Sequence, residues 1–432
     1  MKPTTTAGRA GTLTALAVAT GVFLAVIPGH RGWFDVGVYY GTVQHWTAGG
    51  ALYDYTHPNS TMGFTYPPFA AVCMLPMALI GWHTAVAVSV TLSALAAAAL
   101  LLWLVDPIAR RHGWNRWFTF GVAGCLLGLL EPVRDTFSFG QVNLLLLALV
   151  LSDWWLLAGA GRGGAGSGRT IAGRDPSRYA GIGIGLAAAF KLTPAVFILY
   201  LLVTRRRRAA LVATATAAGA TLLGRLAAPQ ASHAFWTDLL WNTDRVGSLS
   251  YVSNQSLQGM IARLAPQVAG HALWGLAVLA VLALWAYRVH RAAAAGDELT
   301  GFALTGLTSC LISPITWIHH LVWVLPALVL LADAGLREPV GSGRRRRLLT
   351  AAGAGYVVLC SSVVWIWRFD TASVGGLLGG STYLWITLGL LIALPVRPLP
   401  ARPLRAGPLP PAGPADARRH ERLTVSSEPG TR

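Results

Sequence analysis

The stretch from Gly32 to Pro68 collects side chains that are suited to acid–base chemistry. It contains two carboxylates (Asp35 and Asp54), two histidines and a series of tyrosines and tryptophans, and it ends in Tyr-Pro-Pro. A carboxylate can take the proton of an attacking hydroxyl when it lies within hydrogen-bond reach of that group. Asp35 also precedes a helical pattern over residues 36–48, where a carboxylate can simply cap the helix. Both roles are open for Asp35 at this point.

Basic side chains occur at three further places where an apolar segment begins or ends. Arg134 lies in EPVRDTFSFGQVN, Lys191 stands alone in FKLTP, and His319 and His320 end SPITWIHH. Ionisable groups at membrane depth are costly and commonly functional, and these four can donate charge-assisted hydrogen bonds to a phosphate. Simpler roles remain open, because Arg134 can pair with a carboxylate of its own loop and Lys191 can extend to the membrane interface.

Amide side chains lie close to these basic residues in the sequence. Gln141 and Asn143 stand at the start of an apolar segment, and Gln255 lies in the polar patch SNQSLQG. Side-chain amides both donate and accept hydrogen bonds, so they are suited to sugar hydroxyls. The patch around Gln255 fits the start of a helix equally well.

The sequence lacks the common patterns of metal and nucleotide sites. It has no P-loop, dinucleotide fingerprint, H-E-x-x-H, G-x-S-x-G or D-x-D pattern, and its four cysteines are far apart. Adjacent histidines on a helix point about 100° apart, so His319 and His320 are poorly placed to share one metal ion. We therefore expect neither a metal ion nor a cofactor.

The composition indicates an integral membrane protein with many spans. Hydrophobic residues make up 54% of the 432 residues and charged residues only 12%, against about 25% charged in soluble domains. The formal charge of +17 comes from 34 Lys and Arg against 17 Asp and Glu. These basic residues cluster in short loops between apolar segments, which is the cytoplasmic pattern of membrane proteins. Nucleic-acid binding is therefore not expected.

Charge and hydropathy together predict a topology. Residues 1–11 form a cytoplasmic N-terminus, residues 12–28 the first span, and residues 29–67 the first extracytoplasmic loop. Placing all basic loops inside gives an all-α fold of about 12 spans, several of them shorter than the standard length, with both ends cytoplasmic. The region 12–395 is one transmembrane domain, and the Pro- and Arg-rich residues 396–432 form a disordered tail.

The two sets of loops divide the polar residues unequally. The basic, cytoplasmic loops are 110–116, 162–178, 205–208, 288–291 and 344–347. The extracytoplasmic loops are 29–67, 131–141, 191–194, 226–268, 313–320 and 368–376. The candidate functional residues fall in or beside the second set, which predicts that they meet on the extracytoplasmic side.

An ordered series of motifs resembles a known family. FDVGVYY, GGALY, FTYPPFAA, FGQVNLLLLAL, AAFKLTPAVFILYLL, SNQSLQG and SPITWIHHLVW follow one another in the chain. This series is similar to the actinobacterial polyprenol-phosphate-mannose-dependent α-(1,2)-mannosyltransferases of glycosyltransferase family 87, and the resemblance covers about residues 12–395. It implies a glycosyltransferase C-type membrane fold with an essential acidic residue in the first extracytoplasmic loop, at Asp35. One departure is Tyr40, where the family more often has arginine.

The resemblance implies an inverting hexosyltransferase of the cell membrane. The donor would be mannose β-linked to polyprenyl phosphate, the acceptor a hydroxyl of a glycolipid or lipoglycan, and the product an α-(1,2) linkage. Asp35 would be the general base, and Lys191, His319 or His320, and Arg134 would hold the leaving phosphate. Four residues would contact sugar or acceptor: Tyr66, Gln141, Asn143 and Gln255.

The main alternative is a transporter or flippase whose substrate path is lined by the same residues. Many transporters contain two repeated halves with paired broken helices. No internal repeat is visible in this sequence, which favours the enzyme.

Overall fold

The computed structural model describes residues 5–26, 29–58, 60–161, 175–242, 244–264, 270–370 and 373–397. Within these ranges the chain is helical, with one isolated bridge between Thr56 and Gly63 as its β-structure. The predicted all-α fold class is thus confirmed. Most of loop 162–178, the first four residues and nearly all of the predicted tail lie outside the described residues.

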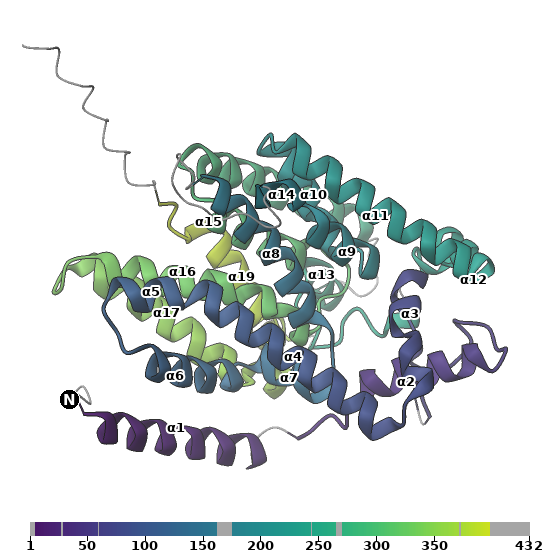
Figure 1. Ribbon diagram of the computed structural model, residues 1–432, viewed down its shortest axis with the longest axis horizontal. Helices are drawn as coiled ribbons and strands as arrows, with labels where there is room; N and C mark the ends of the chain where they lie inside the picture. The colour runs from purple at the N-terminus through teal and green to yellow at the C-terminus, as the bar shows by residue number, and fades with distance from the viewer. Residues whose placement is uncertain are drawn as a thin grey trace, which may run out of the picture. The chain divides into compact units, whose positions relative to one another are not determined.

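Five helices of the described chain are long and apolar enough to cross a membrane. They are α1 (Thr6–Val26), α4 (Trp82–Leu104) continued by α5 (Asp106–Arg111), α11 (Arg207–Ala227), α14 (Gly270–Ala294), and the 3-10 helix η6 (Ile318–Trp323) continued by α16 (Val324–Arg337). Two bent pairs raise the number to seven: α7 (Glu131–Phe139) with α8 (Asn143–Gly161), and α18 (Val374–Gly380) with α19 (Thr382–Ala393). The chain is an integral membrane protein (Figure 1).

The remaining helices are shorter. They are α2 (Phe34–Thr47), α3 (Pro68–Met74), α6 (Arg116–Leu129), α9 (Ile182–Phe190), α10 (Val196–Val203), α12 (Pro229–Ala234), α13 (Leu257–Leu264), α15 (Glu298–Ile312) and α17 (Gly343–Cys360). Apolar helices of 10–17 residues cover 68–79, 116–129, 193–203 and 298–312. The expectation of about 12 spans counted such segments as crossings, although they are shorter than the roughly 20 residues that a standard span requires.

Helix α15 lies at the centre of the bundle. It packs against α14, α16, α10 and α19, and its residues from Thr300 to Leu311 are all buried. A helix that is apolar on every face has to be surrounded by other helices. Helix α1, in contrast, packs on α6 along the edge of the bundle and exposes most of its surface (Figure 1).

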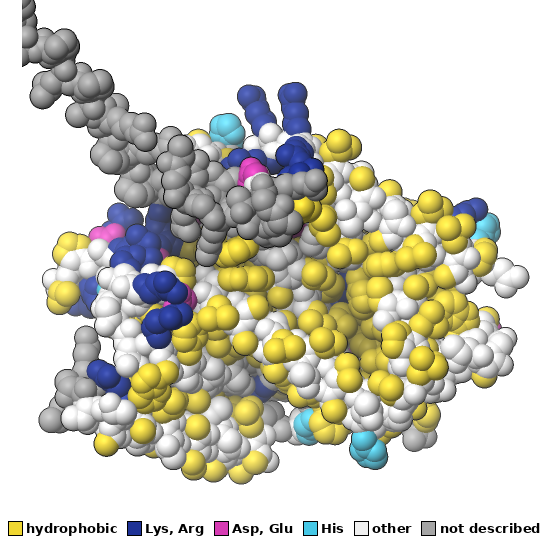
Figure 2. All heavy atoms as spheres, in the orientation of Figure 1, with side chains coloured by type: hydrophobic (Ala, Val, Ile, Leu, Met, Phe, Trp, Pro, Cys, Tyr) yellow, Lys and Arg dark blue, Asp and Glu magenta, His cyan; other side chains and the backbone are white. Residues whose placement is uncertain are grey.

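The basic loops gather at one end of the bundle. Asp333 pairs with Arg111, Arg337 and Arg397, and Arg206 pairs with Glu298. Figure 2 shows Lys and Arg side chains along the upper and left margins of the molecule, and mainly hydrophobic side chains between and below them. The Arg397 N–H also donates to Asp297, beside Glu298, so the described basic segments around residues 111, 206 and 337 are neighbours in space.

The polar loops gather at the other end. The 30-residue helical span Trp82–Arg111 connects the two ends, because Arg111 reaches Asp333 while the Trp82 ring packs against Tyr40 of α2 at 5.8 Å. Figure 1 shows this helix running from α5 to α2. Helix α2 belongs to the loop 29–67, and a large cavity lies beside it.

Candidate active site

A sharp bend between α7 and α8 lies at the end of the bundle where the polar loops gather. The two helices meet at 118°, and Gly140 at the bend has a φ of +72°. A Cβ atom at Gly140 would overlap the Val36 side chain of α2. Glycine is required here both for its positive φ and for the close approach of α2. The bend turns Gln141 toward the cavity and allows α2 to place Asp35 beside it.

Asp35 lies in the first turn of α2, which begins two residues earlier than it would if Asp35 were its N-cap. The helix starts at Phe34, its N-cap is Trp33, and that cap makes no side-chain hydrogen bond. Trp33 is held in the left-handed conformation, with φ 53°, which is uncommon for a bulky residue. The simpler role for Asp35, as the N-cap, is therefore not the one that the structure shows.

One carboxylate oxygen of Asp35 is enclosed and unpartnered. The Oδ2 atom is buried and has no hydrogen-bond partner among the described residues. Burial raises the pKa of Asp35 to about 6, and the neighbouring Gln141 amide and the Lys191 charge oppose this rise. A carboxyl group with a pKa in this range is well suited to exchange a proton with a substrate near neutral pH.

A chain of hydrogen bonds fixes the side chains next to Asp35. The Tyr66 hydroxyl donates to Oε1 of Gln141 at 3.0 Å, and the hydroxyl oxygens of Tyr39 and Tyr66 are 3.1 Å apart. The Tyr53 hydroxyl donates to the Tyr66 carbonyl at 2.8 Å. Tyr66 and Gln141 are buried, so their hydrogen bonds hold them in one orientation at the cavity wall.

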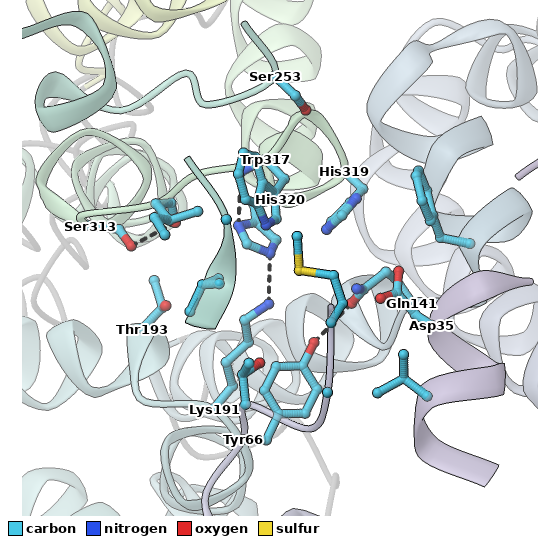
Figure 3. Close-up of a pocket in the computed structure, with 18 of the residues that line it drawn as sticks. Asp35, Tyr66, Gln141, Lys191, Thr193, Ser253, Ser313, Trp317, His319 and His320 are labelled. Atoms are coloured by element: carbon cyan, nitrogen blue, oxygen red, sulfur yellow. Dashed lines mark hydrogen bonds between the residues drawn. The ribbon is translucent and has the colours of Figure 1, made fainter. Parts of the chain in front are cut away.

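Lys191 faces the cavity from the end of α9. Its Nζ atom lies 2.9 Å from Nε2 of His320 and donates to Oδ1 of Asn143 at 3.2 Å. The ammonium group also lies over the Tyr66 ring, 5.1 Å from its centroid. Figure 3 shows Lys191 and Tyr66 side by side, with His320 directly opposite the ammonium group. No carboxylate pairs with Lys191 among the ion pairs of the described chain, so its charge is available to an anion.

The two histidines have different surroundings on η6. His319 packs its ring against Phe139 at 5.3 Å, and its Nε2 atom is buried without a hydrogen-bond partner among the described residues. The backbone carbonyl of His319 accepts hydrogen bonds from Asn143 at 3.1 Å and Thr136 at 3.3 Å. His320 instead uses its ring nitrogens within the protein, toward Lys191 and the Trp317 N–H.

These groups enclose a cavity of about 690 Å³. Six of the nine residues that the sequence singled out line it: Asp35, Tyr66, Gln141, Lys191, His319 and His320. They come from four separate regions of the chain, which the bundle brings together. Among the described residues, no group of three or more His, Cys, Asp and Glu side chains is arranged to hold a metal ion.

Three of the predicted residues do not line the cavity. Arg134 is turned into the protein, where it pairs with Glu131 and donates to the Cys360 carbonyl and to Ser362. Gln255 donates to the carbonyls of Val252 and Gly380, both at 2.6 Å. Arg134 and Gln255 therefore hold neighbouring segments in place and do not reach a ligand in this cavity.

Asn143 stands just behind the cavity wall. It accepts from Lys191 and donates to the His319 carbonyl, so one amide group positions both residues. The direct sugar contact expected of Asn143 stays a prediction, and its contacts in the structure are with these two residues. The SNQSLQG patch behaves similarly, because Asn254 accepts from the Thr316 N–H at 2.9 Å and so fixes the loop before the histidines.

The structure also adds cavity residues that the sequence reading did not select. Arg31, Asp135 and Trp365 line the cavity together with Tyr251 and Trp317. In the sequence, Asp135 stands out only as a carboxylate in the same loop as Arg134, with which it could pair. Arg31 lies one residue before the stretch from Gly32 to Pro68, and Trp365 lies at the end of an apolar segment. Neither residue therefore stands out in the sequence as a candidate for the site.

Comparisons with known proteins agree with this picture. The family model for glycosyltransferase family 87 matches residues 64–314. A polyprenol-phosphate-mannose-dependent α-(1-2)-phosphatidylinositol mannoside mannosyltransferase of Mycolicibacterium smegmatis is 32% identical, over 85% of this chain and 81% of the relative. The protein of the same description from Mycobacterium tuberculosis is 31% identical, over 84% and 82%.

A third relative has a more elaborate acceptor in its name. The polyprenol-phosphate-mannose-dependent α-(1-2)-phosphatidylinositol pentamannoside mannosyltransferase of Mycolicibacterium smegmatis is 31% identical, over 81% of this chain and 80% of the relative. No solved structure matches the chain. The family match over more than half of the chain and the relatives over most of it lead to one conclusion: the chain belongs to glycosyltransferase family 87.

Proposed function

We propose that this protein is an inverting mannosyltransferase that moves mannose from polyprenyl-phosphate-mannose to a hydroxyl of a glycolipid or lipoglycan, forming an α-(1,2) linkage. One observation carries the proposal: the carboxylate of Asp35, whose Oδ2 atom is buried without a hydrogen-bond partner among the described residues, shares a cavity with the ammonium group of Lys191, which makes no close ion pair with a carboxylate of the described chain. The names of the relatives support the donor and the linkage.

Asp35 is the general base of this reaction. The acceptor hydroxyl oxygen attacks the anomeric carbon from the face opposite the phosphate, and the bond from that carbon to the phosphate oxygen breaks. The hydroxyl proton passes to Asp35, and the polyprenyl phosphate leaves with the bonding electrons. A β-linked donor thereby gives an α-linked product. The raised pKa of Asp35, about 6, makes the carboxylate a better proton acceptor than an exposed aspartate.

Lys191 stabilises the departing phosphate. An already ionised phosphate needs no proton to leave, but it needs fixed positive charge and hydrogen-bond donors at the position where charge accumulates. Lys191 supplies the charge and His319 a hydrogen bond from Nε2. His320 and Asn143 orient Lys191 through the contacts described above. Tyr66 and Gln141 bind the mannose between Lys191 and Asp35.

The active site faces the extracytoplasmic side of the cell membrane. This orientation follows from the position of the basic loops at the other end of the bundle, because short cytoplasmic loops carry the excess of Lys and Arg. The fold is of the glycosyltransferase C type, in which the bent helix pairs and the shorter apolar helices supply the crossings beyond the five long ones, to a total of about 12. The transferase domain spans residues 12–395, and the basic tail is cytoplasmic.

The test is mannose transfer in membranes that contain equal amounts of inserted protein. Wild-type protein, Asp35→Asn and Asp54→Asn would be compared with polyprenyl-phosphate-mannose and a phosphatidylinositol mannoside acceptor. Asp54 is the matched control, because it lies in the same loop, is exposed and does not line the cavity. Loss of the general base should lower the rate by about 10²–10⁴-fold, while the control keeps wild-type activity.

Two results would oppose the proposal. Equal transfer by Asp35→Asn and wild-type protein would remove Asp35 as the base. If the wild-type protein moved the lipid-linked sugar across the membrane and left the donor intact, the transporter hypothesis would be favoured.

A further inference from the structure

Two charged side chains of the cavity have no use in the reaction described above. Arg31 and Asp135 both line the cavity, and neither side chain makes an ion pair or a hydrogen bond within the described chain. The Arg31 backbone is nonetheless fixed by two hydrogen bonds to Ser138. The Arg31 N–H donates to Oγ of Ser138 at 2.6 Å, and the Trp33 N–H donates to the Ser138 carbonyl at 2.9 Å. The backbone of Arg31 is thus held in place, while its exposed guanidinium has no hydrogen-bond or ion-pair partner within the described chain.

Aromatic rings surround this pair of charges. The Arg31 guanidinium lies 5.2 Å from the Trp365 ring centroid and 5.6 Å from that of Phe139. Tyr251 continues the wall, 6.0 Å from Trp365 and 6.1 Å from Trp317, with interplanar angles of 68° and 72°. Neighbouring rings meet edge to face and are not stacked, so each pair leaves the faces of at least one ring free of its partner. Such faces pack well against the C–H groups of a sugar ring.

The aromatic rings are themselves anchored. The Trp365 Nε1–H donates to Oε1 of Glu131 at 2.7 Å, and the Tyr251 carbonyl accepts from the guanidinium of Arg263 at 3.2 Å. Glu131 and Arg263 are both buried. Buried polar groups thus support the aromatic wall from behind. Burying polar groups costs free energy, which would be an unfavourable arrangement for a wall that only fills space.

We propose that Arg31, Asp135, Trp365, Tyr251 and Trp317 form a saccharide subsite that binds a neutral sugar of the acceptor, next to the hydroxyl that is mannosylated. This inference rests on the proposed function. A sugar ring presents hydroxyls that both donate and accept, so it satisfies the Asp135 carboxylate and the Arg31 guanidinium at once. An acceptor phosphate would satisfy Arg31 but would be repelled by Asp135.

The position of the subsite fits this role. The Phe139 ring contacts both the Arg31 guanidinium, 5.6 Å from its centroid, and the His319 ring at 5.3 Å, and His319 packs against His320, which contacts Lys191. The subsite therefore borders the donor-phosphate position. Figure 3 shows Trp317 and Ser253 on one side of the two histidines and Lys191 on the other. A sugar held at the subsite therefore shares the cavity with Asp35, the base that takes the proton of its reacting hydroxyl.

The experiment measures equilibrium binding of radiolabelled octyl α-mannoside to the purified full-length chain. Wild-type protein would be compared with Arg31→Gln and Asp135→Asn, and with the matched controls Arg291→Gln and Asp54→Asn, whose side chains are exposed and do not line the cavity. Binding of farnesyl phosphate, measured on the same samples, reports whether the donor-phosphate position and the fold are intact. Arg31→Gln alters an exposed side chain, so it remains informative if Asp135→Asn fails to insert.

The expected result is a loss of octyl α-mannoside affinity of about tenfold or more in both variants, as for the removal of hydrogen bonds to charged groups. Farnesyl phosphate affinity should stay within about twofold of wild type, and both controls should bind both probes normally. This pattern would stand even if no transfer activity were found, so the subsite and the reaction are tested separately.

Three outcomes would overturn the subsite. The first is unchanged octyl α-mannoside binding in Arg31→Gln and Asp135→Asn. The second is failure of wild-type protein to bind octyl α-mannoside while it binds farnesyl phosphate. The third is loss of binding by Arg31→Gln for the phosphorylated probe alone, which would make Arg31 an anion site.

Discussion

Nζ of Lys191 lies 2.9 Å from Nε2 of His320, and Nδ1 of the same imidazole lies 3.2 Å from the backbone nitrogen of Trp317. His320 is therefore fully engaged by the protein, whereas Nε2 of its neighbour His319 has no partner among the described residues. In the sequence alone, the two histidines are equivalent candidates for the phosphate contact. The structure separates them into a residue that positions Lys191 and a residue that can touch the substrate.

This difference can be measured with a double-mutant cycle. Lys191→Met should lower transfer by about 10²–10³-fold, as for loss of one preorganised charge-stabilising group. In that background His320→Asn should have little further effect, since its partner is gone, while His319→Asn should retain most of its own effect. The coupling energy between Lys191 and His320 should be at least about 1 kcal/mol. Additive effects of Lys191→Met and His320→Asn would contradict the positioning role.

The pH dependence of transfer should report Asp35. Its active form is the carboxylate, and burial raises its pKa to about 6. The rate at low acceptor concentration should therefore fall about tenfold per unit below that pH and reach a plateau above it, for as long as Lys191 keeps its positive charge. Steady-state rates between about pH 4.5 and 8.5 test this, with Asp54→Asn giving the same profile as wild-type protein. A decline centred near the ordinary aspartate value would show that Asp35 is not the limiting base.

The same carboxylate should cost the protein stability. A carboxyl group whose folded-state pKa is raised from 3.8 to about 6 binds a proton more tightly when folded than when unfolded. Stability is thus highest below the unfolded pKa and declines as the pH rises through about 4 to 6. At neutral pH, Asp35→Asn should be more stable by about 1–3 kcal/mol, seen as a higher temperature of thermal aggregation in detergent. The gain should disappear near pH 4, and an equal gain at both pH values would point to another cause.

The bend at Gly140 should not tolerate a side chain. Gly140→Ala places a methyl group against Val36 and forces alanine into positive φ, so it should destabilise the fold by about 1–3 kcal/mol and displace Asp35. Gly124→Ala is the matched control, because a Cβ there has no atom within 4 Å and α6 is a regular helix. Thermal stability and transfer should both fall in Gly140→Ala only. Equal stability of the two variants would show that α2 does not depend on this contact.

Much of the fold could be predicted, because it follows from composition. Apolar segments and basic loops are repeated many times along the chain, so the all-helical membrane class and the grouping of the loops are strongly determined. The number of spans is less determined. Segments such as 298–312 and 116–129 are apolar like the five long helices, and only the packed structure shows how far each of these helices extends.

The candidate site was predictable where a residue type is rare in its surroundings. Lys191 is an isolated charge in an apolar region, and Asp35 is a carboxylate at the start of a polar loop. Arg134 and Asp135 show the limit. They are adjacent on α7, so their side chains point about 100° apart, and only the direction of the helix decides which one faces the cavity. Arg134 turned to Glu131 and Ser362, and Asp135 to the cavity.

The cluster around Asp333 has a consequence for how this protein is made. Its arginine partners Arg111 and Arg397 are 222 and 64 positions away along the chain, and the ribosome delivers them in that order. Arg111 is synthesised long before Asp333, and Arg397 is synthesised after the described helices. The group of ion pairs around Asp333 can therefore be completed only after Arg397 has been synthesised.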